Sequence, residues 1–298
     1  MKVIVFGGSG FIGSHVADEL TEKGYDVDIF DRIPSKYLKE NQKMIIGDIF
    51  ESDTVEKAIK NADYVYNFAG IADLDDASTR PLDTVRYNIL GNNIILDASV
   101  KARIKRYIYA STIYVYSSSG GFYRCSKQAA ELYIEEYSRK YNLDYTILRF
   151  GTVYGPRADE RNSIYRYLLQ ALKEGRITCQ GTGEEMREYI HVRDVARACV
   201  EILSDEFRNN HIILTGNNPM KFKEMLEMIK EILNNEVEIE FQPVTKGSNH
   251  YNITPYSFTP KIGDKYFSKR HIDMGQGILE SIHEIYGKME KVKQTRGK

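Results

Sequence analysis

Glycines crowd the start of the chain, in the segment VIVFGGSGFIGSHV, at four positions: Gly7, Gly8, Gly10 and Gly13. The run Lys2–Phe6 before them predicts a strand, and the pattern Phe11–Lys23 predicts a helix. The first two glycines allow a tight turn, Gly10 lets the backbone approach a pyrophosphate, and Gly13 lets the helix lie close to the strand. Strand, turn and helix together predict a dinucleotide site, with the phosphates at the helix N-terminus.

Polar residues follow the next two predicted strands, Asp26–Phe30 and Met44–Ile46. Asp31 comes eighteen residues after the last of these glycines, where a carboxylate can bind the adenosine ribose hydroxyls and repel a 2′-phosphate. This favours NAD, although Arg32 could either stack on adenine or tolerate NADP. Asp48 could accept a hydrogen bond from the adenine amino group, or it could serve as a turn or helix-cap residue.

Short β-rich runs alternate with helical patterns through the first half of the chain. Further strands are predicted at Tyr64–Phe68, Arg106–Tyr109 and Tyr145–Leu148, and long helices at Thr84–Lys101 and Phe122–Tyr141. Strands that alternate with helices imply right-handed βαβ crossovers. We therefore expect an α/β fold with a Rossmann-type, doubly wound parallel sheet.

The alternation loosens after Gly155 and Pro156. The elements expected there are a helix at Ser163–Glu174, a strand at Ile177–Gln180, a helix at Val192–Leu203, a strand at His211–Leu214 that returns to the sheet, and helices at Phe222–Leu233 and Gln276–Tyr286. We expect a dinucleotide-binding domain of residues 1–155 plus about 192–215. A smaller C-terminal α/β substrate domain would take residues 156–191 and 216–298.

Composition excludes several classes of partner. Lys and Arg number 41 against 42 Asp and Glu, so charge gives no argument for nucleic acid or an anionic membrane surface. The N-terminus lacks the pattern of a signal peptide, and no apolar run reaches the length of a membrane span. The three cysteines have neither disulfide nor metal-ligand spacing. We expect a cytoplasmic protein without a metal site.

A second set of candidate residues lies in the segment STIYVYSSSGGFYRCSKQAAE, from Ser111 to Glu131. Tyr123 and Lys127 are one helical turn apart and share a face. A Lys ammonium beside a phenol would lower the pKa of Tyr123 and make it a usable base, and the same ammonium could hold a nicotinamide ribose. The Thr112 hydroxyl could bond the reacting oxygen of a substrate. Cys125, inside this turn, is expected to be a packed small residue.

These motifs together resemble the extended short-chain dehydrogenase/reductases, in their NAD-dependent nucleotide-sugar epimerase/dehydratase group of the UDP-glucose 4-epimerase type. The family's "STxxVYG" stretch matches Ser111–Ser117, and its YxxxK pair matches Tyr123–Lys127. The segments YNILGNNIILDAS, LRFGTVYGPR and GTGEEMREYIHVRDVARA resemble three further family segments. The resemblance runs from residue 1 to about residue 220.

The resemblance implies NAD as cofactor, a nucleotide-diphosphate sugar as substrate, and a homodimer that pairs the helices Thr84–Lys101 and Phe122–Tyr141. It implies that the catalytic residues are Thr112, Tyr123 and Lys127. Cofactor contacts would fall on Gly7, Gly10, Phe11, Ile12, Gly13, Asp31, Arg32, Asp48, Ile49, Ala69, Asn88, Tyr123 and Lys127. Substrate contacts would fall on Thr152, Arg187 and Lys261.

The chain departs from the family pattern at two places. The loop between Thr112 and Tyr123 is short, so part of one wall of the site is missing or is rebuilt, for which Tyr251–Phe258 is a candidate. Thr152 stands where the family has an asparagine, which puts one substrate-phosphate contact in doubt.

The residues after the catalytic threonine bear on the reaction. Ile113 and Tyr114 stand where 4,6-dehydratases of the family have Asp and Glu, and where decarboxylases keep a Glu at the second position. The resemblance therefore implies an epimerase that works through a 4-keto hexose, without loss of water or carbon dioxide. A dehydrogenase that releases the keto product is an alternative, and so is a catalytically idle NAD-binding regulator.

Overall fold

The computed structural model describes residues 1–216, 219–243 and 253. The predicted helix Gln276–Tyr286, the predicted substrate residue Lys261 and, apart from residue 253, the segment Tyr251–Phe258 lie outside the described residues.

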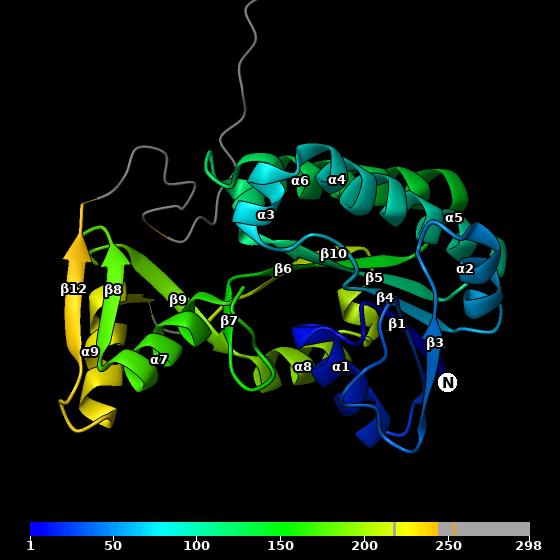
Figure 1. The fold of residues 1–298 in the computed structure, drawn as a ribbon. Coiled ribbons are helices and arrows are strands. Elements are labelled where there is room, and N and C mark those ends of the chain that lie inside the picture. Colours follow the sequence, from blue (N-terminus) through cyan, green and yellow to red (C-terminus); the bar gives the residue numbers. More distant parts are fainter. Residues whose placement is uncertain (217–218, 244–252, 254–298) are drawn as a thin grey trace, which may run out of the picture. The chain divides into compact units, whose positions relative to one another are not determined.

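A parallel sheet of seven strands organises the first half of the chain (Figure 1). Its order is β10-β6-β5-β4-β1-β2-β3. The strands are β1 (Lys2–Phe6), β2 (Asp26–Asp31), β3 (Gln42–Ile46), β4 (Tyr64–Asn67), β5 (Arg106–Thr112), β6 (Tyr145–Phe150) and β10 (Asn210–Leu214). Strand order reverses between β1 and β4, and in such sheets ligands bind at the carboxyl ends of the strands beside this point. The predicted Rossmann-type sheet is confirmed, including the return of β10.

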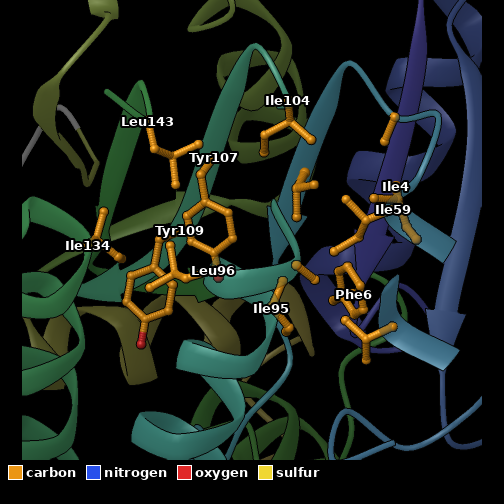
Figure 2. Close-up of a cluster of buried hydrophobic side chains, with 14 of the residues drawn as sticks. Ile4, Phe6, Ile59, Ile95, Leu96, Ile104, Tyr107, Tyr109, Ile134 and Leu143 are labelled. Carbon is orange, nitrogen blue, oxygen red and sulfur yellow. The ribbon is translucent and has the colours of Figure 1, made fainter. Parts of the chain in front are cut away.

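Helices cover both faces of this sheet (Figure 1). The helices α1 (Phe11–Glu22) and α8 (Val192–Glu201) lie on one face, and α2 (Ser52–Ile59), α5 (Asn92–Ala102) and α6 (Gly121–Tyr141) lie on the other. Figure 2 shows the core beneath the second group, where Ile59, Ile95 and Ile134 are fully buried. Burial of each such side chain contributes roughly 1.5–3 kcal/mol. This packing fixes α6, the helix that carries Tyr123 and Lys127, against the sheet.

The stretch predicted as one helix, Thr84–Lys101, is built from three pieces. It begins as α4 (Pro81–Val85), widens into the π-helical segment η1 (Arg86–Gly91), and continues as α5. A side chain at Gly91 would come within 2.3 Å of Ile49, so this segment packs closely on the loop after β3. π-helical turns are often found at functional sites, and this one carries Asn88.

The later segments form two small sheets. One contains β11 (Pro219–Lys221), β9 (Met186–His191) and β7 (Thr152–Tyr154), and the other pairs β12 (Glu238–Gln242) with β8 (Arg176–Gln180). The helices α7 (Ser163–Glu174) and α9 (Phe222–Ile232) share a core cluster with β8, distinct from the clusters under the large sheet. The division into a cofactor domain and a substrate domain stays a prediction. Within the described part of the chain, no helix is both long and apolar enough to cross a membrane.

Candidate active site

The predicted site residues gather where parallel strands of the large sheet end. The glycine turn follows β1, Asp31 ends β2, Ala69 follows β4, and Thr112 ends β5. Because these strands are parallel, their carboxyl ends lie along one edge of the sheet. The sequence motifs, far apart in the chain, are thereby brought to one side of the fold.

The glycine turn leaves no room for side chains. Gly7 has φ +74° and its N–H donates to the Phe30 carbonyl at 2.9 Å. A Cβ at Gly7 would lie 2.7 Å from the Ala69 nitrogen, and one at Gly13 would lie 2.3 Å from the Gly7 carbonyl oxygen. No side chain caps the start of α1, so the N–H groups of its first turn can face an anion. This cradle, with Phe11 and Ile12 in its first helical turn, fits a dinucleotide pyrophosphate.

Asp31 braces the same turn. Its carboxylate accepts hydrogen bonds from the backbone N–H of Ser9 at 3.1 Å and of Arg32 at 2.8 Å. The side chain therefore sits beside the pyrophosphate cradle, at the end of β2. This position suits the predicted contact with the adenosine ribose.

Arg32 is engaged with a residue that the sequence did not single out. Its guanidinium donates to the Tyr87 hydroxyl at 3.0 Å and lies 5.0 Å from the centre of the Tyr87 ring. Tyr87 in turn packs on Phe50, with ring centres 5.1 Å apart, and the Arg86 guanidinium lies 4.5 Å from the Phe50 ring. The hydroxyl and the ring of Tyr87 thus hold Arg32 against η1.

Three further residues predicted to contact the cofactor, Asp48, Ile49 and Ala69, make contacts within the protein. Asp48 accepts a hydrogen bond from the Phe50 N–H at 3.1 Å, which agrees with the turn role left open for it. Ile49 is buried, and the Ala69 N–H donates to the Asn67 side chain at 3.0 Å. These contacts lie in the loops after β3 and β4. The predicted contacts of Asp48, Ile49 and Ala69 with NAD stay predictions.

We expect the apo protein to bind NAD far more tightly than NADP. The Asp31 carboxylate would repel a 2′-phosphate and would accept bonds from the ribose hydroxyls that NAD retains. The Arg32 guanidinium, the local group of opposite charge, is held by Tyr87. Calorimetric titration with each dinucleotide measures the ratio, and equal affinities would contradict the role of Asp31.

The side-chain amide of Asn88 is hydrogen-bonded to other residues of the protein. Its two N–H groups donate to the Ile71 carbonyl and to the Ser126 hydroxyl, both at 2.9 Å, and its oxygen accepts from the Ile71 N–H at 2.7 Å. The side chain is almost completely buried. Asn88 thus ties the loop after β4 to α6, and an influence on the cofactor would pass through that loop.

The predicted catalytic residues Thr112, Tyr123 and Lys127 are all buried. The Thr112 side chain lies near enough to the Tyr123 hydroxyl to act on its pKa. Burial raises the pKa of Tyr123 to about 12, and the polar side chain of Thr112 acts in the opposite direction. The expected lowering of this pKa by Lys127 is not found. The Lys127 ammonium instead donates to the Ala110 carbonyl at 2.7 Å, 5.9 Å from the centre of the Tyr123 ring.

Lys127 is itself perturbed by its surroundings. Burial lowers the pKa of its ammonium to about 8, and the negative charge of Glu131 acts in the opposite direction. The ammonium also lies 4.7 Å from the centre of the Tyr109 ring on β5. Lys127 thus titrates close to neutral pH, and Glu131 favours its charged form.

Tyr114 fills part of the space left by the short loop. Residues Ile113–Tyr116 form a single 3₁₀ turn, η2, and the Tyr114 ring packs edge-on to Tyr123 with ring centres 6.3 Å apart. Ile113 is buried. The charge of Asp73, which caps the helix α3 (Leu74–Thr79), raises the pKa of Tyr123. Asp73 was not among the predicted site residues, although an acidic residue shortly after β4 is visible in the sequence.

The predicted substrate residues lie in the small three-stranded sheet. Thr152 stands opposite Tyr189 in the pairing of β7 with β9, and Arg187 stands opposite Met220 in the pairing of β9 with β11. The Arg187 guanidinium donates to the Met186 carbonyl at 3.2 Å. The two residues share one sheet, and their contacts with a substrate stay predictions.

The glycine cradle, placed between β1 and α1 of a doubly wound parallel sheet, is typical of a dinucleotide-binding Rossmann fold. The chain belongs to the NAD dependent epimerase/dehydratase family, whose model matches residues 3–216. This confirms the resemblance seen in the motifs, and NAD is the cofactor that the family uses.

Similar proteins catalyse several reactions. A putative UDP-glucose 4-epimerase of Methanocaldococcus jannaschii is 26% identical, over 94% of this chain and 97% of its own length. The human dTDP-D-glucose 4,6-dehydratase is 29% identical, over 80% of this chain and 77% of its own. The UDP-glucose 4-epimerase of Thermotoga maritima, in its crystal structure with UDP-glucose, is 28% identical in sequence. The two structures match with a TM-score of 0.79, over 87% of this chain and 90% of that one.

Proposed function

We propose that this protein is an NAD-dependent nucleotide-sugar epimerase that acts through a 4-keto hexose. The observation that carries the proposal is the buried set Thr112, Tyr123 and Lys127, at the end of β5 and the start of α6, beside the sheet edge that also carries the glycine cradle. The resemblance to proteins described as UDP-glucose 4-epimerases supports it.

Each of the three residues has a distinct task in this mechanism. Tyr123 accepts the proton of the C4 hydroxyl, and Thr112 holds that oxygen beside it. NAD, when bound, would supply the hydride acceptor for C4 and, on the opposite face of the keto sugar, the hydride donor. Tyr123 then returns its proton to the C4 oxygen, so that proton and hydride are both conserved. Lys127 orients the nicotinamide ribose and supplies positive charge near the phenol.

Substrate anchoring belongs to the later part of the chain in this proposal. We propose that Arg187 contacts the diphosphate, that Thr152 lies beside the sugar nucleotide, and that Lys261 adds a second cation. Incubation with UDP-, GDP-, CDP- and dTDP-linked hexoses, followed by NMR of the anomeric protons, tests the function. New anomeric signals from one sugar support it. Oxidised product with stoichiometric NADH would identify a dehydrogenase, and NAD binding without any turnover would identify a regulator.

We expect neither water nor carbon dioxide to leave the substrate. Elimination and decarboxylation in this family use a carboxyl group after the catalytic threonine, where this chain has Ile113 and Tyr114, and a phenol without a nearby cation is a poor base near neutral pH. Incubation with the substrate in deuterated water, read by mass spectrometry, measures this. A product of unchanged mass with inverted C4 is expected. A product lighter by one water, with deuterium at C5 or C6, would show that Asp73 or Tyr114 acts as the missing base.

We propose a homodimer that pairs the helices α4–η1–α5 and α6 of two copies. Apolar side chains on these helices are exposed in the single chain: Leu82, Val85, Leu90, Phe122, Leu132 and Tyr133. Leu132 is 62% exposed. Cys125, expected to be packed, is also exposed on α6. A contiguous apolar patch marks an interaction site, and we propose that these side chains form one.

A charge placed in this surface should separate the two copies. Leu132→Glu adds a carboxylate to the proposed interface and leaves the core of the fold untouched, because Leu132 is exposed. We expect the mass in light scattering to fall from that of a dimer to that of a monomer. Leu172→Glu, on the exposed side of α7, is the control and should leave the mass unchanged. A wild-type protein that is already monomeric at micromolar concentration would refute the dimer.

A further inference from the structure

Behind the catalytic residues lies a buried polar network that the proposed mechanism does not use. Its centre is Glu131 of α6. Both carboxylate oxygens of Glu131 bind the Arg149 guanidinium, through Nε at 3.1 Å and Nη2 at 2.6 Å. The Ser111 hydroxyl donates to the same carboxylate, and the Arg149 guanidinium also donates to the Tyr116 hydroxyl.

This network joins four elements around the catalytic residues. Ser111 belongs to β5, Arg149 to β6, Tyr116 to η2 and Glu131 to α6. The side chains of the ion pair are only 14% and 7% exposed for Arg149 and Glu131. A two-pronged guanidinium–carboxylate pair at such depth has a defined geometry, so the four elements are held in a fixed relation.

Two members of the network lie close in the sequence to the predicted catalytic residues. Ser111 directly precedes Thr112, and Glu131 follows Lys127 by one turn of α6. A hydrogen bond at Ser111 therefore fixes the end of β5 from which the Thr112 hydroxyl projects. A carboxylate four residues after an ammonium on one helix lies on the same face.

We propose that Glu131 is a positioning residue: it keeps the Lys127 ammonium charged in its buried setting and fixes the Thr112 segment against α6. The proposal deepens, and rests on, the proposed function. Arg149 places a cation directly on Glu131, through both carboxylate oxygens, so the buried carboxylate is paired and held in one orientation.

The surroundings of Lys127 show why such a charge is needed. From β5 it meets the Ala110 carbonyl and the Tyr109 ring, and from α6 it lies beside the Tyr123 ring, with Glu131 one helical turn further on. The carbonyl and the two rings are neutral. Of these groups, only Glu131 carries a charge that offsets the cost of burying the ammonium.

A double variant separates this role from plain structural support. Glu131→Gln alone would leave the buried Arg149 without its partner, and the variant could fail to fold. Glu131→Gln combined with Arg149→Met removes both charges and keeps similar volumes, which is often tolerated. Glu135→Gln is the matched control, because Glu135 lies one turn further along α6, where its carboxylate is 3.1 Å from His211.

The readout is the titration of Lys127 itself, followed by the ¹³Cε chemical shift in protein with ¹³C-labelled lysine and assigned with Lys127→Met. In the wild type the midpoint should lie near pH 8. In the double variant we expect it to fall by roughly one pH unit or more, a tenfold loss of proton affinity. Glu135→Gln should leave the midpoint unchanged. As the pH is raised, the double variant should lose turnover at a lower pH than the wild type, because its Lys127 ammonium gives up its proton earlier.

A folded double variant with the wild-type midpoint would overturn the proposal and leave the network a purely structural one. This outcome does not depend on the reaction, since the titration needs no substrate. If the wild type turns over none of the nucleotide sugars, the proposed function fails, and the midpoint of the double variant still decides the role of Glu131.

Discussion

Tyr123→Phe is expected to lower turnover by roughly 10²-fold or more, the usual effect of removing a general base, while NAD binding persists. The substitution keeps the buried ring and its edge-on packing against Tyr114. It removes the hydroxyl that lies near Thr112 and that would take the C4 proton. Steady-state rates with the identified nucleotide sugar, beside calorimetric NAD affinities, measure the two effects separately.

Tyr109→Phe is the matched control for this variant. Tyr109 is also a buried tyrosine, and its ring also lies beside the Lys127 ammonium, but the mechanism gives its hydroxyl no task. Its turnover should remain within a few-fold of the wild type. Near-normal turnover of Tyr123→Phe would refute Tyr123 as the base and would direct attention to Asp73.

Gly13→Ala should damage both stability and cofactor binding. A methyl group at this position would lie 2.3 Å from the Gly7 carbonyl oxygen and 2.9 Å from the Gly8 Cα. Because the opposing atoms are backbone, α1 itself must shift away from the turn, at a cost of about 1–3 kcal/mol or more. The shift also displaces the helix N-terminus that would face the pyrophosphate. We expect a lower melting temperature and an NAD affinity reduced by about tenfold or more.

Gly10→Ala distinguishes the two parts of this effect. A Cβ at Gly10 meets only the Gly7 carbonyl oxygen, at 3.2 Å, and the residue has an ordinary φ of −79°. The variant should fold almost as stably as the wild type and still bind NAD weakly, since the methyl group would intrude on the pyrophosphate. A Gly13→Ala protein with the melting temperature and NAD affinity of the wild type would contradict the close helix–turn contact.

Much of the large sheet could be predicted because its strands are buried and bounded by clear turn signals. The run Lys2–Phe6 matches β1, and the helix predicted at Ser163–Glu174 has the bounds of α7. The short strands β7 and β11 have three residues each, too few for a period-two pattern to stand out. The π-helical turn η1 was missed because its sequence has the same apolar spacing as an ordinary helix.

The site was predictable where chemistry follows a local motif, and not where it follows tertiary contact. The spacing of Tyr123 and Lys127 is local, and so is the glycine turn. The bond of Arg32 to Tyr87 joins residues 55 positions apart, and the pair Glu131–Arg149 joins residues 18 positions apart. The pKa of Tyr123 was misjudged for the same reason: burial, a property of the whole fold, raises it, and the Lys127 ammonium donates to the Ala110 carbonyl instead.

The double engagement of Asp31 constrains how the cofactor preference of this protein could be redesigned. The usual way to admit NADP is to remove the acid at the end of the second strand. Here that acid also accepts the Ser9 N–H of the glycine turn, so its removal would loosen the turn that both dinucleotides need. Tyr87→Phe would remove the hydroxyl that binds Arg32 and leave Asp31 and the turn in place, so that the guanidinium, still beside the ring, has a donor for the extra phosphate. A change of cofactor would therefore begin at Tyr87, a residue outside the glycine motif.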